Sequence, residues 1–135
     1  MDRSSDPPAE NSPQDRISPS SDLGRWAENE AARFLTEQGC EVIARNFGGR
    51  HGEIDLVVRD GACLVFVEVK ARSSIGYGKP AHAVGWRKQQ RLRRTALEFL
   101  DSHRPGTGDL RFDVVAIVVV EGQVDPIVEH FRAAF

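Results

Sequence analysis

The stretch GEIDLVVRDGACLVFVEVK, residues 52–70, predicts a β-hairpin. Two runs rich in Val, Leu, Ile and Phe flank the dipeptide Asp60-Gly61, which is typical of two-residue hairpin turns. If Asp60-Gly61 forms the turn, the pairing of the two strands brings Glu53 opposite Glu68. This hairpin is the element from which the rest of the fold can be inferred.

Alternation of side chains divides the hairpin into two faces. One face is purely apolar, and we expect it to pack on the core. The other carries Glu53, Asp55, Glu68 and Lys70 at the end away from the turn. Opposed carboxylates destabilise a sheet by up to ~1 kcal/mol, and Mg²⁺ or Mn²⁺ would remove this repulsion because these ions prefer carboxylate oxygens. The alternative is a solvated polar face on which Lys70 neutralises Glu68.

Hydrophobic periodicity predicts further elements on both sides of the hairpin. In chain order, we expect a helix over 23–38, strands over 40–45, 53–59 and 62–70, a helix over 85–102, strands over 111–120 and 124–128, and a helical turn over 129–135. Loops are expected over 46–52 and 73–83. The apolar run within 111–120 is typical of a strand in the middle of a sheet. The order predicts an α/β fold with an α-β-β-β-α-β core, in which helices flank a central mixed sheet.

The 135-residue chain has room for one domain preceded by a tail. Residues 1–22 are rich in Pro and Ser and carry five acidic against two basic side chains, which predicts a disordered acidic tail before a single domain over 23–135. Two cysteines without a CxxC pair exclude a disulfide framework and disfavour a zinc site. No apolar run approaches the about 20 residues that span a bilayer. We therefore expect a cytoplasmic protein without a membrane partner.

Charged residues on the two expected helices allow two interpretations each. Glu28 lies beside the buried stripe of the first helix, either as a side chain that snorkels at the core margin or as a carboxylate aimed into a site. On the second helix, Arg87, Arg91 and Arg94 form an outer stripe, which is either solvated or bound to phosphates. Lys88 lies next to the buried stripe, where it either snorkels or reaches the acidic cluster.

The hairpin residues resemble a known nuclease motif. Gly52-Glu53-Ile54-Asp55 followed by Phe66-Val67-Glu68-Val69-Lys70 resembles the D…(D/E)-x-K motif of the restriction-endonuclease-like, or PD-(D/E)XK, superfamily. Over residues 23–135 the chain more closely resembles the YraN family, also called UPF0102. That resemblance rests on Gly24-Arg25-Trp26-Ala27-Glu28, Arg45-Asn46, Pro80, Lys88, Arg111-Phe112-Asp113 and Ala134-Phe135. Two departures, Ala27 in place of a second Gly and Ile54 in place of the superfamily's Pro, touch no expected ligand.

The resemblance implies an αβββαβ core and residue roles similar to those of archaeal Holliday-junction resolvases. By that similarity, Asp55, Glu68 and Glu28 bind Mg²⁺ or Mn²⁺, and Lys70 orients the attacking water. These four are the expected catalytic residues, and Glu53 and Lys88 are expected beside them. Contact with nucleic acid is expected from Arg72, Lys79, Arg87, Lys88, Arg91 and Arg94.

We therefore expect a metal-dependent nuclease that hydrolyses phosphodiester bonds in DNA. Branched or damaged DNA is a candidate substrate, and both endo- and exonucleolytic cleavage remain open. The alternative is a non-catalytic nucleic-acid-binding module with the same fold. A homodimer is also open, by analogy with junction-type enzymes of similar fold.

Overall fold

The computed structural model describes residues 22–73, 84–103, 106 and 108–135. Almost all of the predicted tail and the loop over 74–83, with Lys79, lie outside the described residues. The elements are α1 (Asp22–Glu37), β1 (Glu41–Gly49), β2 (Gly52–Asp60), β3 (Cys63–Arg72), α3 (Trp86–His103), β4 (Asp109–Val118) and β5 (Ile127–Phe131). None of the described helices has the length and apolar character needed to cross a bilayer.

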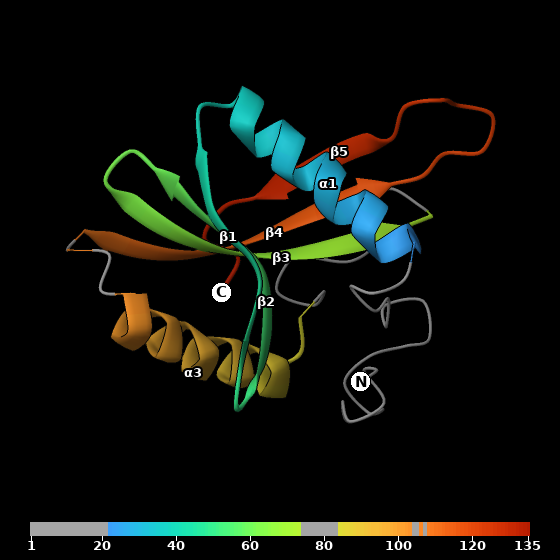
Figure 1. Cartoon of the computed structure of the whole chain (residues 1–135). Coiled ribbons are helices and arrows are strands. Elements are labelled where there is room, and N and C mark those ends of the chain that lie inside the picture. Colours follow the sequence, from blue (N-terminus) through green and yellow to red (C-terminus); the bar gives the residue numbers. More distant parts are fainter. Residues whose placement is uncertain (1–21, 74–83, 104–105, 107) are drawn as a thin grey trace.

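The strands form one mixed sheet in the order β1-β2-β3-β4-β5. Neighbouring strands are antiparallel except for β3 and β4, which are parallel and joined through α3. A parallel pair needs such a crossover because the chain must return to the same end of the sheet. Figure 1 shows α1 across one face of the sheet and α3 across the other. The predicted α/β class and α-β-β-β-α-β order are confirmed, and the last strand, expected over 124–128, is β5 at Ile127–Phe131.

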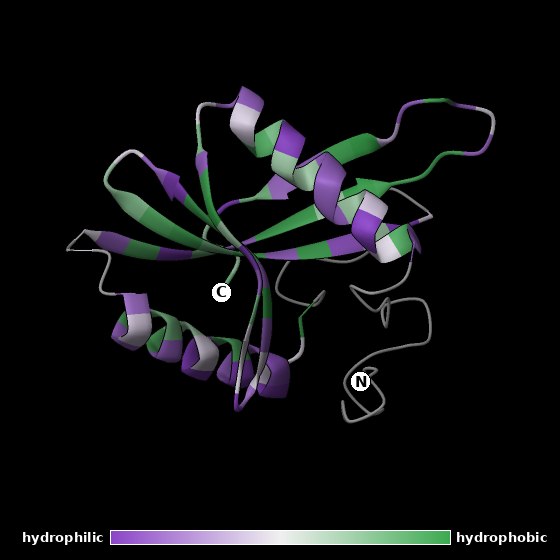
Figure 2. Cartoon of the chain, viewed as in Figure 1, coloured by the Kyte–Doolittle hydropathy of each residue, from purple (hydrophilic) through white to green (hydrophobic). Residues whose placement is uncertain are grey.

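Both faces of the sheet are covered by core. Under α1 lies a cluster that includes Leu35, Val65 and Ile117, and under α3 lies one that includes Phe66 and Phe99. Figure 2 shows the apolar residues of the inner strands between the two helices. The alternative of a solvated polar hairpin face is therefore wrong, because α3 covers the second face and Glu68 and Lys70 are buried on it.

The β2–β3 turn lies one residue later than predicted. Asp60 pairs with Cys63, so Gly61-Ala62 forms the turn, with Gly61 at a φ of 62°. Glycine adopts this left-handed conformation without steric cost. The register moves by two residues, which leaves the paired side chains of 56–60 and 63–67 on their predicted faces. It brings Asp55, rather than Glu53, level with Glu68.

Two further expectations fail at the ends of strands. The predicted loop over 46–52 belongs largely to β1 and β2, and only Arg50-His51 forms the turn between them. Gly49, the last residue of β1, lies against α3, and a Cβ there would make the Glu98 carboxylate move. The expected helical turn over 129–135 is instead the end of β5, which pairs with β4, and a following turn. A segment of seven residues is too short for its periodicity to separate helix from strand.

Candidate active site

The site begins where β2 and β3 separate. The described ladder between these strands ends at the pair Leu56 and Val67. Beyond it, Oδ2 of Asp55 accepts a hydrogen bond from the Val69 N–H at 2.8 Å. Ile54 lies with Val57 in the core under α3, so the alternation of faces is interrupted around Asp55. The Asp55 carboxylate therefore takes the place of a ladder carbonyl and reaches the backbone of β3.

Side chains from both helices meet the strands at this gap. Among the residues that the structure describes, seven polar or charged side chains are buried, and five of them belong to this site. Their exposed fractions are 6% for Glu28, 6% for Asp55, 5% for Glu68, 2% for Lys70 and 9% for Lys88. Such burial of ionisable groups is rare unless they are paired or bind a ligand.

Both lysines approach the same carboxylate. The Nζ of Lys88 lies 2.8 Å from Oε2 of Glu68, and the Nζ of Lys70 lies 3.9 Å from the same oxygen. Lys88 comes from α3 and Lys70 from β3, two residues after Glu68. Of the two interpretations that the sequence left open for Lys88, this contact favours the one in which it reaches the acidic cluster.

Asn46 holds the carboxylate that α1 contributes. Its Nδ2 donates a hydrogen bond of 2.9 Å to Oε1 of Glu28, and its φ of 51° is left-handed. Asparagine tolerates this conformation better than most residues. In the sequence, Arg45-Asn46 stood out only as part of a family resemblance, and Asn46 was expected to begin a loop. The structure places it inside β1 instead.

The electrostatics of the site disfavour the ionised form of Asp55. Burial raises the pKa of Asp55 well above its ordinary value, and the charges of Glu68 and Glu28 raise it further. The Val69 N–H and Lys88 oppose this rise without cancelling it. If all five buried groups are ionised, three carboxylates and two ammonium groups leave one net negative charge. A proton or a metal ion would neutralise that charge.

The carboxylates present fit Mg²⁺ or Mn²⁺ in chemistry and number. Within residues 22–73, 84–103, 106 and 108–135, no three His, Cys, Asp or Glu side chains are grouped closely enough to form a ready metal site. Mg²⁺ commonly takes only one or two carboxylates and keeps several waters. Asp55 and Glu68, with Glu28 near them, meet that requirement, and oxygen donors suit these ions better than zinc.

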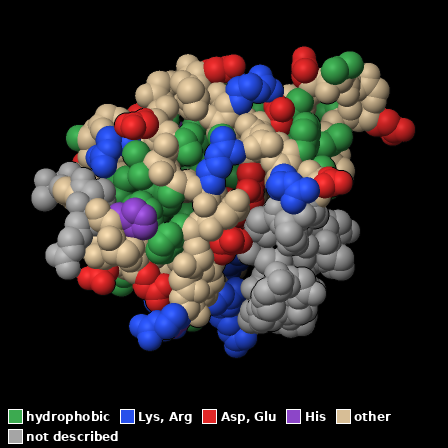
Figure 3. Space-filling view, viewed as in Figure 1, with side chains coloured by type: hydrophobic (Ala, Val, Ile, Leu, Met, Phe, Trp, Pro, Cys, Tyr) green, Lys and Arg blue, Asp and Glu red, His purple; other side chains and the backbone are tan. Residues whose placement is uncertain are grey.

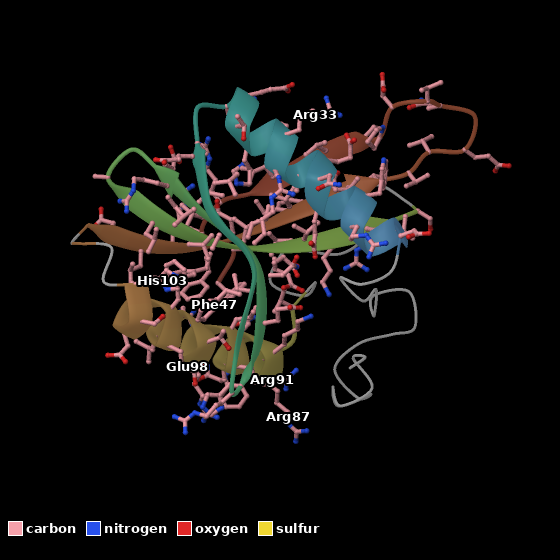
Figure 4. All side chains as sticks on the ribbon, in the orientation of Figure 1. Arg33, Phe47, Arg87, Arg91, Glu98 and His103 are labelled. Atoms are coloured by element: carbon pink, nitrogen blue, oxygen red, sulfur yellow. The ribbon has the colours of Figure 1, made fainter. Side chains whose placement is uncertain are left out.

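The other predicted residues lie around this centre. Glu53 is half-buried near the start of β2 and pairs with Gly48 of β1 in the sheet register. Arg72 is half-buried at the end of β3, where its carbonyl accepts a 2.8 Å hydrogen bond from the Val119 N–H. On α3, Arg87 and Arg94 are exposed and Arg91 is half-buried, and Figure 4 shows Arg87 and Arg91 near the beginning of that helix.

The fourth buried carboxylate, Asp113 of β4, belongs to a separate cluster. The Arg111 guanidinium donates to both of its oxygens, from Nε at 2.9 Å and from Nη2 at 3.0 Å. Nε2 of His130 lies 2.8 Å from Oδ2, and the Ala133 N–H donates to Oδ1 at 3.0 Å. Burial alone would raise the pKa of Asp113, but the hydrogen bonds from His130, Arg111 and Ala133 outweigh it and lower that pKa.

Comparison with known proteins identifies the family. The model of the uncharacterised protein family UPF0102 matches residues 27–117. A UPF0102 protein of Rhodococcus opacus is 50% identical over 113 residues, which cover 84% of this chain and 95% of the relative. A UPF0102 protein of Nocardia farcinica is 42% identical over 120 residues, or 89% of this chain and 94% of the relative. The chain therefore belongs to the UPF0102 family.

Proposed function

We propose that this protein is a metal-dependent nuclease that hydrolyses phosphodiester bonds in DNA. The observation that carries the proposal is the buried pair Asp55 and Glu68, which lies in the gap between β2 and β3 with Glu28 close enough to raise the pKa of Asp55. Carboxylates gathered in this way destabilise a fold unless a cation compensates them. Perturbed ionisable groups of this kind are typical of functional sites.

Asp55 and Glu68 would hold Mg²⁺ or Mn²⁺, with Glu28 as a third oxygen donor. Such an ion supplies an activated water and neutralises the charge that develops on a phosphate during hydrolysis. Lys70 is almost fully buried beside Glu68, so its ammonium group can orient a water at a fixed position. Lys88 lies on the α3 side and can transfer its ion pair from Glu68 to a phosphate oxygen of the substrate.

The ion pair between Lys88 and Glu68 also favours a second candidate. At 2.8 Å it neutralises Glu68 within the protein, so the fold does not depend on a metal ion for that charge. A nucleic-acid-binding module with the same fold but without catalysis would retain such a pair. Cleavage activity separates the two functions, because both predict binding and only one predicts hydrolysis.

The test is incubation of the purified full-length chain with labelled linear, nicked, flapped and four-way DNA. Reactions contain Mg²⁺, Mn²⁺ or EDTA, and the variants are Asp55→Asn and Glu68→Gln. Asp101→Asn, an exposed acid on α3, is the matched control. We expect cleavage with either metal, none in EDTA, and at least ~100-fold less cleavage in the two site variants, the scale on which loss of an electrostatic catalytic group is measured.

Cleavage that persists in EDTA, or that is equal in Asp55→Asn and Asp101→Asn, would contradict the nuclease proposal. Binding of DNA without cleavage under every metal condition would favour the non-catalytic module.

A further inference from the structure

Trp86, the first residue of α3, is 71% exposed. The other tryptophan of the chain, Trp26 on α1, packs against the core under that helix. An indole has a large apolar surface, and burying it normally contributes strongly to stability. Trp86 is the largest of the exposed apolar side chains in the described part of the chain. Its surface is therefore available for a partner.

The backbone that carries Trp86 is held firmly. Val84, two residues earlier, is fully buried, and its carbonyl accepts a 2.8 Å hydrogen bond from Nε2 of Gln89. The Gln89 N–H donates to the Gly85 carbonyl at 2.9 Å. These contacts fix the turn that leads into α3. The indole consequently projects from a defined point on the surface.

The surroundings of Trp86 are basic. Residues 86–97 contain five Lys or Arg side chains and no acid. Lys88 is paired with Glu68, and the Arg93 guanidinium lies over the Phe112 ring at 4.9 Å. Arg87 and Arg94, on the same helix as Lys88 and Arg93, are exposed. In Figure 3, Lys and Arg side chains gather at the lower edge of the molecule, near the beginning of α3.

An exposed aromatic ring among cations matches single-stranded nucleic acid. Proteins that bind single-stranded nucleic acid stack successive bases on aromatic side chains and hold the phosphates with Lys and Arg. Bases in an intact duplex are already stacked, so Trp86 can accept only an unpaired one. Charge complementarity favours this occupant over an apolar protein surface, which would have to desolvate Arg87 and Arg94.

We propose that Trp86 stacks on an unpaired base and selects single-stranded segments as substrate. This inference rests on the proposed function, because it names the form of nucleic acid that the same site receives. Lys88 follows Trp86 by two residues and reaches Glu68. A strand stacked on Trp86 is therefore anchored to the helix that also contributes to the candidate active site.

The test is binding in EDTA, which keeps hydrolysis out of the measurement. The full-length chain is titrated against a labelled single-stranded dT12, a 12-mer of abasic sites with the same charge, and a 12-base-pair duplex, with anisotropy as readout. The variants are Trp86→Ala and Trp86→Phe, and Leu110→Ala removes an exposed apolar side chain outside α3 as control.

We expect dT12 to bind more tightly than the abasic 12-mer, and Trp86→Ala to weaken dT12 binding at least about fivefold while leaving the abasic 12-mer unchanged. This is the scale of one lost base–aromatic stack. Trp86→Phe should retain most of the affinity, and Leu110→Ala all of it. Quenching of tryptophan emission by dT12, absent in Trp86→Ala, would support the same contact.

Equal binding of dT12 by the wild type and Trp86→Ala would overturn the inference. A blue shift of tryptophan emission caused by higher protein concentration alone, or by anionic vesicles, would overturn it in favour of self-association or a membrane. If dT12 binding depends on Trp86 but no substrate is cleaved, the inference stands and the nuclease proposal fails.

Discussion

Asp55 and Asp113 are both buried aspartates of the central sheet, yet their surroundings move their pKa values in opposite directions. Hydrogen bonds from a guanidinium, an imidazole and a backbone N–H outweigh burial at Asp113 and lower its pKa. Asp55 has one backbone donor, and two more carboxylates add to the effect of burial and raise its pKa. Hydrogen bonds thus outweigh burial at Asp113, whereas at Asp55 burial and the neighbouring carboxylates outweigh the Val69 N–H and Lys88.

This difference separates a structural carboxylate from a candidate functional one. A buried charge that is fully paired inside the chain contributes to folding and has no need of a ligand. A buried carboxylate that is surrounded by other acids destabilises the fold until a cation binds. Such a carboxylate is explained if the bound cation serves the function of the protein. The two residues are thus a matched pair for experiments.

The largest difference in stability is expected between the variants Asp113→Asn and Asp55→Asn. Asp113→Asn removes one of the two carboxylates that Arg111 pairs with and leaves it Asp60. It should lower the free energy of unfolding by about 3 kcal/mol, at the lower end of the range for breaking a buried ion pair. In EDTA, Asp55→Asn should leave that free energy unchanged or raise it, because it relieves repulsion from Glu68 and Glu28. Urea unfolding of both variants measures the difference.

A loss of about 3 kcal/mol in Asp55→Asn as well would show that Asp55 is structural through its bond to the Val69 N–H. The comparison between the two sites would then break down.

Added Mg²⁺ should act on one site only. At tenfold excess over the dissociation constant it should stabilise the wild type by about 1.4 kcal/mol, with the same increment in Asp113→Asn and none in Asp55→Asn. Thermal melts with Mg²⁺ and with EDTA give the increments. Equal increments in all three proteins would place the ion elsewhere.

Acid should weaken the protein partly through Asp113. Because its pKa is lowered in the folded state, the stabilisation by this carboxylate is present above its unfolded pKa of about 3.9 and is lost as pH falls through the folded value. The free energy of unfolding of Asp113→Asn should therefore fall less steeply below about pH 4 than that of the wild type. Parallel curves for the two proteins in this range would contradict the assignment.

The smallest effect on stability is expected from relieving backbone strain at Ala133, which contacts Asp113, and at Asn46, which contacts Glu28. Ala133 and Asn46 are the described non-glycine residues with positive φ, at 50° and 51°. Ala133→Gly should add up to about 1 kcal/mol of stability, because the left-handed conformation costs alanine ~1–2 kcal/mol and the bond from its N–H to Asp113 remains. Asn46→Gly relieves less strain and loses the bond to Glu28, so urea unfolding should show no gain. A gain in both variants would mean that Asn46 does not position Glu28.

Local sequence rules were sufficient for the two helices and the first four strands, though not for all of their ends, and they brought several charged residues of the candidate site onto shared faces. The strand period of two put Asp55, Glu68 and Lys70 on one hairpin face, and the helix period put Glu28 at the edge of the buried stripe. A register shift of two residues preserves the faces of the paired segments, whereas the alternation is interrupted at Asp55, next to which Ile54 joins the core under α3. The family resemblance added the expected roles, which remain predictions.

Contacts between residues far apart in the chain were decided only by the tertiary structure. The β2–β3 register followed from the turn Gly61-Ala62, which begins at Gly61 instead of Asp60. The last strand, β5, forms by pairing with the edge of β4. The ion pair between Lys88 and Glu68 and the bond from Asn46 to Glu28 each join two different elements. The sequence determined which side chains could face the core or the site, because alternation is local. Packing determined which of them meet, because burial leaves each charged group only the partners that the neighbouring elements bring to it.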